Sequence, residues 1–262
     1  MKTVTAIMGS ARRKGFTFQA TRRFLDNLSA IGDVQCEMLY LSDFAIQPCN
    51  GCKVCFLRGE EFCPLKDDRD RLLRKMLDSD GVVFATPNYS FQVSGRMKLL
   101  LDRLGFVFHR PCFHGKVFTC IVAQGIYGGG KVEKYLRFAG GGLGFNVVKG
   151  SCVTALEPMT AKDREKMEKA IDAQSRRFHQ RLMKPELPVP SFFQLMGFRM
   201  GRTSVRLTLS EDKRDYTYYR ERGWFDSDYF YPTELGLIKK AAGAAFDWTA
   251  GRVFANHRTS RA

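Results

Sequence analysis

Four cysteines stand close together in the first quarter of the chain. They are Cys49, Cys52, Cys55 and Cys63, in the pattern C-x2-C-x2-C-x7-C-P. Three thiols at successive x2 spacings can point to one centre, and a fourth from beyond a loop can complete a four-thiolate site of the kind that holds an iron–sulfur cluster. A zinc ribbon instead pairs two separated CxxC units. Structural zinc and thiols that bind no metal stay open as alternatives.

Three other segments have the residue types that hold a phosphorylated ligand. Residues 9–17, GSARRKGFT, combine a glycine, hydroxyls and a helix N-terminus, which can surround a phosphate. The segment lacks the Gly-Lys-Ser/Thr of a Walker loop, and it is not GxGxxG. Residues 86–98, TPNYSFQVSGRMK, offer a rigid backbone and aromatic rings suited to a planar ligand. Residues 124–130, QGIYGGG, let the main chain approach a ligand closely.

Each of these segments also has an ordinary interpretation. The first is a common strand-to-helix turn, Tyr89 and Phe91 of the second are core aromatics, and the third is a flexible connector. What favours a ligand site is that the three segments follow the first, third and fourth predicted strands. We expect such connections to meet at one edge of a sheet.

The hydrophobic pattern predicts these strands and the helices between them. Short apolar runs that indicate buried strands cover residues 3–8, 34–41, 82–86, 117–123 and 145–148. Helical periodicity indicates helices from Thr17, which we expect as an N-cap, at 72–77, after the N-cap Ser94, at 132–138 and at 161–183. The alternation predicts an α/β fold, a flavodoxin-like doubly wound parallel sheet of five strands with helices on both faces.

The domain organisation follows from a break at PELPVP, which interrupts helix and strand alike. We predict a flavodoxin-like α/β domain over 1–184 with a cysteine-rich insertion at 47–66, and an aromatic, basic and mainly helical extension over 185–262. A final helix from Glu234 to about Phe254 has an expected apolar stripe: Leu235, Ile238, Ala242, Ala245 and Phe246. Association with a membrane surface through 234–254 is the less favoured use of this stripe, and packing on its own domain or on a partner subunit is favoured.

The segments above resemble the NADPH-dependent FMN reductase family of flavodoxin-like proteins, whose first loop reads G-S-x-R-x-x-G-x-T and whose second reads P-x-Y followed by S-G-x-M-K. The similarity covers roughly residues 1–183, and the FRMGR, RERGWF and YFYP elements of the tail are similar to longer members. The resemblance implies FMN as cofactor, NAD(P)H as co-substrate and a homo-oligomer. It also implies these FMN contacts: Ser10, Arg12, Gly15, Phe16 and Thr17 at the phosphate; Pro87, Asn88, Tyr89, Ser90 and Phe91 beside the ring; and Gln124, Gly125 and Gly128 at its polar edge.

The cysteine motif resembles that of the iron-sulfur flavoproteins, relatives with the same fold in which such a motif holds a [4Fe-4S] cluster. We therefore expect an NAD(P)H-dependent FMN-containing oxidoreductase that passes electrons to a small-molecule or protein acceptor. The alternative is an electron carrier that uses FMN and a cluster without a pyridine nucleotide. A cysteine-based redox or zinc module without flavin is a third interpretation. No residue is assigned a catalytic role, and His109 and His114 are interpreted as turn or surface residues.

Composition narrows the remaining classes. The chain has 262 residues, of which 44% are hydrophobic and 26% charged, and this balance is typical of a folded domain. The net charge of +15 is spread over small groups without a nucleic-acid motif, so we expect no nucleic-acid partner. The start of the chain has no signal-peptide pattern and no apolar run reaches membrane-spanning length, which favours a cytoplasmic location. Cys36, Cys120 and Cys152 lie on or beside strands and are expected in the core.

Overall fold

The computed structural model describes residues 1–154, 156–184 and 186–255. The chain forms two compact units. The first consists of Met1–Cys49, Lys66–Gly105 and Phe113–Glu186, and the second of Asn50–Leu65, Phe106–Cys112 and Leu187–Ala262. The boundary expected after Lys184 lies close to the last junction, and the second unit also takes in two earlier segments.

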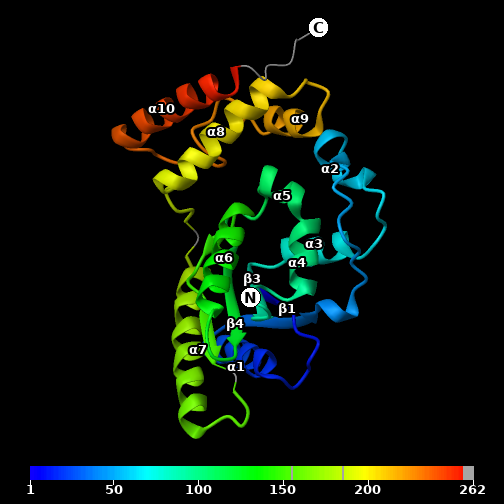
Figure 1. The fold of residues 1–262 in the computed structure, drawn as a ribbon. Helices are drawn as coiled ribbons and strands as arrows, with labels where there is room; N and C mark the ends of the chain where they lie inside the picture. Colours follow the sequence, from blue (N-terminus) through cyan, green and yellow to red (C-terminus); the bar gives the residue numbers. More distant parts are fainter. Residues whose placement is uncertain (155, 185, 256–262) are drawn as a thin grey trace. The chain divides into compact units, whose positions relative to one another are not determined.

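The first unit is built on a parallel sheet (Figure 1). Its strands are β1 (Lys2–Met8), β2 (Val34–Tyr40), β3 (Gly81–Pro87), β4 (Val117–Gln124), β5 (Asn146–Val147) and β6 (Ser151–Thr154). The order is β2-β1-β3-β4-β5, and β6 also pairs with β4. This is the doubly wound, flavodoxin-like arrangement that the sequence predicts.

The fifth position of the sheet differs in detail from the expected single strand at 145–148. β5 pairs with Val117 and Phe118 at the start of β4, and β6 pairs with the end of the same strand. Between them the amide of Gly150 donates to the carboxylate of Glu133, a buried residue of α6 (Gly129–Gly142), over 3.0 Å. The chain therefore leaves the ladder and returns to it, because a side chain takes one of its backbone donors.

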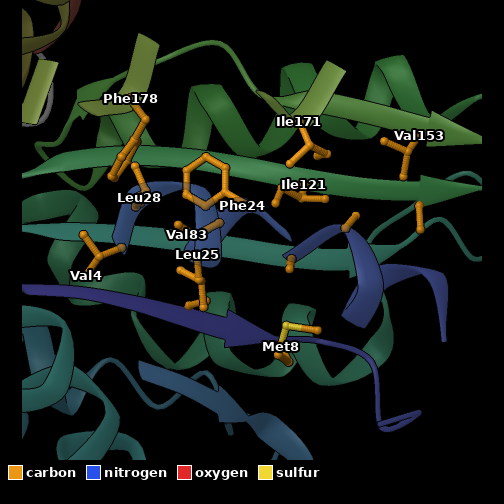
Figure 2. Packing of buried hydrophobic residues seen from close by; sticks show 14 of the residues in the cluster. Val4, Met8, Phe24, Leu25, Leu28, Val83, Ile121, Val153, Ile171 and Phe178 are labelled. Carbon is orange, nitrogen blue, oxygen red and sulfur yellow. The ribbon is translucent and has the colours of Figure 1, made fainter. Parts of the chain in front are cut away.

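Helices cover both faces of the sheet. α1 (Phe16–Ile31) and α7 (Ala161–Leu182) pack against each other on one face. The helices α3 (Arg69–Leu77), α4 (Gly95–Arg103) and α6 also belong to this unit, and α5 (Gly105–His109) follows α4. Figure 2 shows the core under α1 and α7, where Phe24 and Phe178 meet edge to face with ring centroids 5.4 Å apart. This packing fixes the ends of the strands that carry the loops.

The two expected N-caps have different outcomes. The Ser94 hydroxyl accepts a hydrogen bond from the Met97 amide at the start of α4, as predicted. The expectation for Thr17 is wrong, because α1 begins at Phe16 after Gly15 and Thr17 is buried inside the first turn. A glycine in an extended conformation can end the preceding loop without a side-chain cap, so the helix begins earlier than its first hydroxyl.

The cysteine-rich insertion leaves and rejoins the sheet domain at one place. The Asp68 carboxylate accepts a hydrogen bond from the Ala45 amide over 2.8 Å, and the Asp68 amide donates to the Ala45 carbonyl over 2.9 Å. Asp67, whose side chain is 2% exposed, accepts from the Gln47 amide and pairs with the buried Arg103 over 3.0 Å. Burial alone would raise the pKa of Asp67, but the bonds from Gln47, Arg103 and Arg69 together lower it.

The second unit contains the short helix α2 (Val54–Leu57) of the insertion and most of α5. It also contains three helices from the end of the chain, α8 (Phe192–Thr208), α9 (Arg214–Glu221) and α10 (Leu237–Val253). Of the three C-terminal helices, the sequence predicts only α10. The core of this unit is aromatic, with Phe198, Tyr219, Trp224 and Tyr229 among its buried residues. The motifs FRMGR, RERGWF and YFYP thus supply core side chains.

The apolar stripe expected on the last helix faces inward only in part. Leu235, just before α10, is buried, and Phe246 packs against the aromatic core. Ile238 and Ala245 are exposed, and Gly243 and Ala250 are buried and face α8. Two arginines of α8 explain this orientation, because Arg199 and Arg202 bind the Asp247 carboxylate over 2.9 and 2.5 Å. The charged side of α10 therefore faces the protein. No helix in the described part of the chain is long and apolar enough to cross a membrane.

Candidate functional site

The connections after β1, β3, β4 and β6 border one pocket of the first unit, with a volume of about 320 Å³. Its lining residues are Ser10, Arg12, Gly15, Phe16, Thr17, Pro87, Asn88, Tyr89, Ala123, Gln124, Gly125, Leu156 and Glu157. The strand order reverses between β1 and β3, and both of the loops that follow these strands contribute. Ligands of doubly wound sheets bind at such a reversal.

The loop after β1 places a cation and a helix N-terminus at the pocket. Ser10 is 5% exposed, and its hydroxyl accepts a hydrogen bond from the Arg12 amide over 3.2 Å. The neighbouring Arg13 points elsewhere: its guanidinium pairs with both oxygens of Asp43, at 2.6 and 2.8 Å. The loop is thus tied to the end of β2 by one arginine while the other lines the pocket.

The loop after β3 is a tight hairpin turn. Tyr89 and Gln92 exchange backbone hydrogen bonds of 3.0 and 2.9 Å, and Ser90 and Phe91 between them have φ of 49° and 63°. Non-glycine residues adopt such angles only where the surroundings impose them. The turn exposes Tyr89 and Phe91, each by just over half of its surface. The turn therefore holds the Tyr89 ring at the pocket and the Phe91 ring beside it.

The start of this loop is fixed from β1. Ser94 donates its hydroxyl to the Gly9 carbonyl over 2.8 Å, and its amide donates to the Thr86 hydroxyl over 3.0 Å. A Cβ on Gly9 would lie 2.7 Å from that serine oxygen, so no larger residue fits without movement. Ser94 therefore joins the first two loops as well as capping α4.

The loop after β4 closes against the hairpin. Asn88 donates its side-chain amide to the Tyr127 carbonyl over 3.1 Å, and the rings of Phe91 and Tyr127 lie 5.3 Å apart. Gly128 has φ of 95°, and a Cβ there would lie 2.6 Å from the Phe91 ring. Gln124 accepts a hydrogen bond from the Gly129 amide over 2.7 Å at the first turn of α6. The glycine-rich sequence is thus required by close packing.

Ten of the thirteen residues expected to contact a cofactor line this pocket. The other three, Ser90, Phe91 and Gly128, lie in the same loops and shape the hairpin and its contact. Sequence reasoning missed three lining residues, Ala123 near the end of β4 and Leu156 and Glu157, which follow β6. The only available signal for the last two was their place after the fifth predicted strand, because neither residue type suggests a ligand site.

One buried atom tests whether the pocket suits a polar planar ligand. The carbonyl oxygen of the Asn88 side chain is buried and has no hydrogen-bond partner within the described residues. A buried acceptor without a donor costs about 1–3 kcal/mol, so a ligand N–H at this point would be favoured. The pocket therefore combines a cationic side chain and a helix N-terminus with an amide acceptor and aromatic residues. This donor set fits a phosphorylated ring compound.

The comparison with protein families agrees with this geometry. Residues 2–157, more than half of the chain, match the model of the NADPH-dependent FMN reductase family. The chain belongs to this family. Within the family match lie all four pocket-lining loops and the cysteine motif.

Two of the relatives that the chain matches are named iron-sulfur flavoproteins. The chain is 37% identical over 100 residues to an iron-sulfur flavoprotein of Methanocaldococcus jannaschii. This match covers 38% of this chain and 50% of the relative. It is 33% identical over 163 residues to an iron-sulfur flavoprotein of Archaeoglobus fulgidus, and this match covers 57% of this chain and 71% of the relative. The chain thus spans half the length of the first of these relatives. The crystal structure of RosB with a bound intermediate shares the fold, with a TM-score of 0.57, 16% identity, and coverage of 70% of this chain and 79% of RosB.

The four cysteines of the motif differ in their exposure to solvent. Cys49 and Cys52 are exposed, Cys55 is half-buried and Cys63 is buried. Across residues 1–154, 156–184 and 186–255, no group of three or more Cys, His, Asp or Glu side chains is placed to hold a metal ion. Metal binding by the motif stays a prediction.

A buried ionic network holds the cysteine segment within the second unit. The Arg110 side chain is 3% exposed and donates to the Cys55 carbonyl over 3.0 Å and to the Glu60 carboxylate over 2.7 Å. It also pairs with Asp215 of α9 over 3.1 Å. The other oxygen of Asp215 lies 2.9 Å from Nδ1 of His109, whose ring stacks on Phe56 with centroids 4.2 Å apart. His109 is half-exposed but has a buried partner, so it is more than a surface residue.

The cysteines expected in the core are found there or next to it. Cys120 is buried, and burial raises the pKa of its thiol. Cys36 and Cys152 are half-buried. Burial, helped by the nearby Glu133 carboxylate, raises the pKa of Cys152 to about 11. These thiols stay protonated and are unsuited to nucleophilic chemistry.

Proposed function

We propose that the pocket of the first unit binds FMN and that the protein is an NAD(P)H-dependent oxidoreductase with an unidentified electron acceptor. The carrying observation is that ten residues from the expected loops line one pocket where the strand order reverses. Membership of the NADPH-dependent FMN reductase family supports both the flavin and the nicotinamide. The acceptor would be a small molecule or another protein.

The phosphate would lie in the loop after β1. Ser10 and Thr17 are buried hydroxyl residues at the pocket, and Arg12 supplies a positive charge. The first amides of α1 have no partner within the helix, so they favour an anion at this end. Together these groups would bind the phosphate and thereby fix the position of the rest of the cofactor.

The ring would lie between the hairpin after β3 and the loop after β4. Tyr89 would border its plane, and the carbonyl oxygen of Asn88 would accept from a ring N–H. When bound, FMN supplies the hydride and electron chemistry. The role of the protein residues is to orient the ring, to exclude water from its face and to leave one side open for the nicotinamide.

Two adjacent arginines provide the test of FMN binding. Arg12 lines the pocket, whereas Arg13 pairs with Asp43. Because a hydrogen bond to a charged group contributes about 1.5–3 kcal/mol, Arg12→Ala should weaken FMN binding about tenfold to a hundredfold. Arg13→Ala should change it by less than about threefold, because it removes only an exposed ion pair. Quenching of FMN fluorescence on titration measures both, and absence of FMN binding by the wild-type protein would refute the proposal.

The hydride donor is tested separately. In anaerobic stopped-flow mixing, NADPH or NADH should bleach the absorption of bound FMN rapidly. The names of the two iron-sulfur flavoprotein relatives favour the other candidate, an electron carrier. For that function, only a protein donor such as ferredoxin would reduce the flavin, and both nicotinamides would leave the absorption unchanged.

The cysteine motif needs its own measurement. We expect iron and sulfide analysis of anaerobically purified protein, with its absorption spectrum, to separate a cluster from zinc and from metal-free thiols. The variant Cys52→Ser should lose the metal if the motif binds one, while Cys152→Ser should keep it because Cys152 belongs to the sheet domain. A colourless protein that binds zinc but no FMN would support the cysteine-based module instead.

A further inference from the structure

Helix α10 has large apolar side chains on the side that faces away from α8. Its inner side faces α8 with Gly243 and Ala250, which are buried. On its outer side, Leu237, Ile238 and Trp248 are 86%, 77% and 60% exposed. A contiguous apolar patch that is exposed on a folded protein marks an interaction surface. In the described part of the second unit, nothing covers the outer side.

The outer residues form one continuous stripe. Besides Leu237, Ile238 and Trp248 it contains the exposed residues Ala241, Ala244 and Ala245. The spacings of three, four and seven residues place them on adjacent turns of one face. No charged residue interrupts the stripe between Leu237 and Trp248. We call these six residues the outer stripe.

We propose that a second copy of this chain covers the outer stripe, with the two α10 helices antiparallel across a two-fold axis near Gly243. The stripe has bulky residues at its ends and alanines in its middle. In the antiparallel arrangement Trp248 would lie over the partner's Ile238, and Ala245 would lie beside the partner's Ala241. Small residues at the crossing let two helices approach closely, and the bulky residues then fill the space at each end. The same patch serves on both subunits, as a two-fold interface requires.

The charges near the stripe support this orientation. The exposed Glu234 precedes the first turn of α10, and Arg252 lies in its last turn with its guanidinium 4.2 Å from the centre of the Trp248 ring. An antiparallel pair brings Glu234 of one chain near Arg252 of the other. It also opposes the two helix dipoles. A parallel pair would place like charges together at both ends.

An anionic membrane surface suits the stripe less well. Half of the six residues are alanines, which contribute little apolar area for insertion, and the exposed cations on the helix are Lys240 and Arg252 only. Interfacial helices combine large apolar residues with a richly basic polar side. Here the opposite side of the helix is occupied by α8 instead. The protein partner is therefore favoured.

The test uses paired charges at the centre of the stripe. Ala241→Glu and Ala245→Lys should each weaken self-association about a hundredfold, because each buries a charge without a partner. An equimolar mixture should associate again to within about tenfold of the wild-type affinity, since the glutamate of one chain then faces the lysine of the other. Sedimentation velocity of the full-length protein measures all samples. Ala161→Glu, which adds the same charge to the exposed start of α7, should have no effect.

Three results would overturn the proposal. The first is a wild-type protein that is monomeric at high micromolar concentration, including one that instead sediments with vesicles of anionic phospholipid. The second is an oligomer that none of the stripe variants weakens. The third is failure of the mixture to recover, which would exclude the antiparallel arrangement. Unchanged thermal melting and FMN affinity of each variant show that the fold is intact, so the result is independent of the proposed function.

Discussion

Arg110 is the residue whose removal should most affect the second unit. Its guanidinium is almost fully buried and binds Glu60, the carbonyl of Cys55 and Asp215. These partners come from the cysteine-rich insertion and from the C-terminal extension. Arg110→Ala therefore breaks the connection between two segments that are distant in sequence.

The expected loss of stability follows from the groups that Arg110 binds and that stay buried in the variant. Asp215, 2% exposed, would keep its contact with His109, and the Cys55 carbonyl would lose the Arg110 donor. Breaking a buried ion pair by removing one member costs about 3–5 kcal/mol. That free energy corresponds to a fall of roughly two to four orders of magnitude in an opening equilibrium.

Amide hydrogen exchange measures this loss where it occurs. We expect protection to fall most in α9 and in residues 54–60, and much less in the strands of the first unit. The control is Arg220→Ala, also in α9, whose guanidinium is 57% exposed and lies 3.6 Å from Glu211. It should change protection by less than about 1 kcal/mol. Equal effects of the two variants, or a loss confined to the first unit, would show that the buried network does not hold the insertion.

Three other predictions concern the first unit. Gly128→Ala should destabilise the protein by about 1–3 kcal/mol because of its positive φ and weaken FMN binding, whereas Gly130→Ala, with open space around it, should be neutral or stabilising; thermal melting and FMN titration compare them. The pKa of Asp67 is lowered in the folded protein, so its contribution is present above about pH 4 and lost below; Asp67→Asn should flatten the acid limb of the stability–pH curve, and an unchanged limb would contradict this. Alkylation at pH 8 should label the exposed Cys49 rapidly and Cys152 slowly, since the pKa of Cys152 is about 11; mass spectrometry of the digest gives the order.

The sheet and its loops could be predicted because the relevant signals are local. An apolar run that ends at Gly9 or Pro87 shows where a strand stops, and parallel strands bring their ends to the same edge. The individual residues Ser10, Arg12 and Asn88 were expected at the site from the resemblance to the FMN reductase family, and they line the pocket. The N-cap Ser94 was visible from its position before a helical pattern.

The features that were missed depend on distant partners. Gly150 leaves the sheet because Glu133, a residue of another element, takes its amide. The inward side of α10 is chosen by Arg199 and Arg202 of α8, which bind Asp247, and no periodicity within α10 shows this. The role of Arg110 likewise requires knowledge of which segments meet. Hydrophobic pattern identifies elements, but buried charges decide how several of them are oriented.

The neighbouring positions of Ala45 and Asp68 make the cysteine-rich segment removable in principle. Backbone atoms at its two ends are already hydrogen-bonded, so the α/β domain needs no long connection there. Evolution can lengthen, shorten or replace such an excursion without disturbing the strands, because closing a loop whose ends already meet costs little. Relatives with different lengths between these points can therefore share one flavin domain while differing in what the excursion carries.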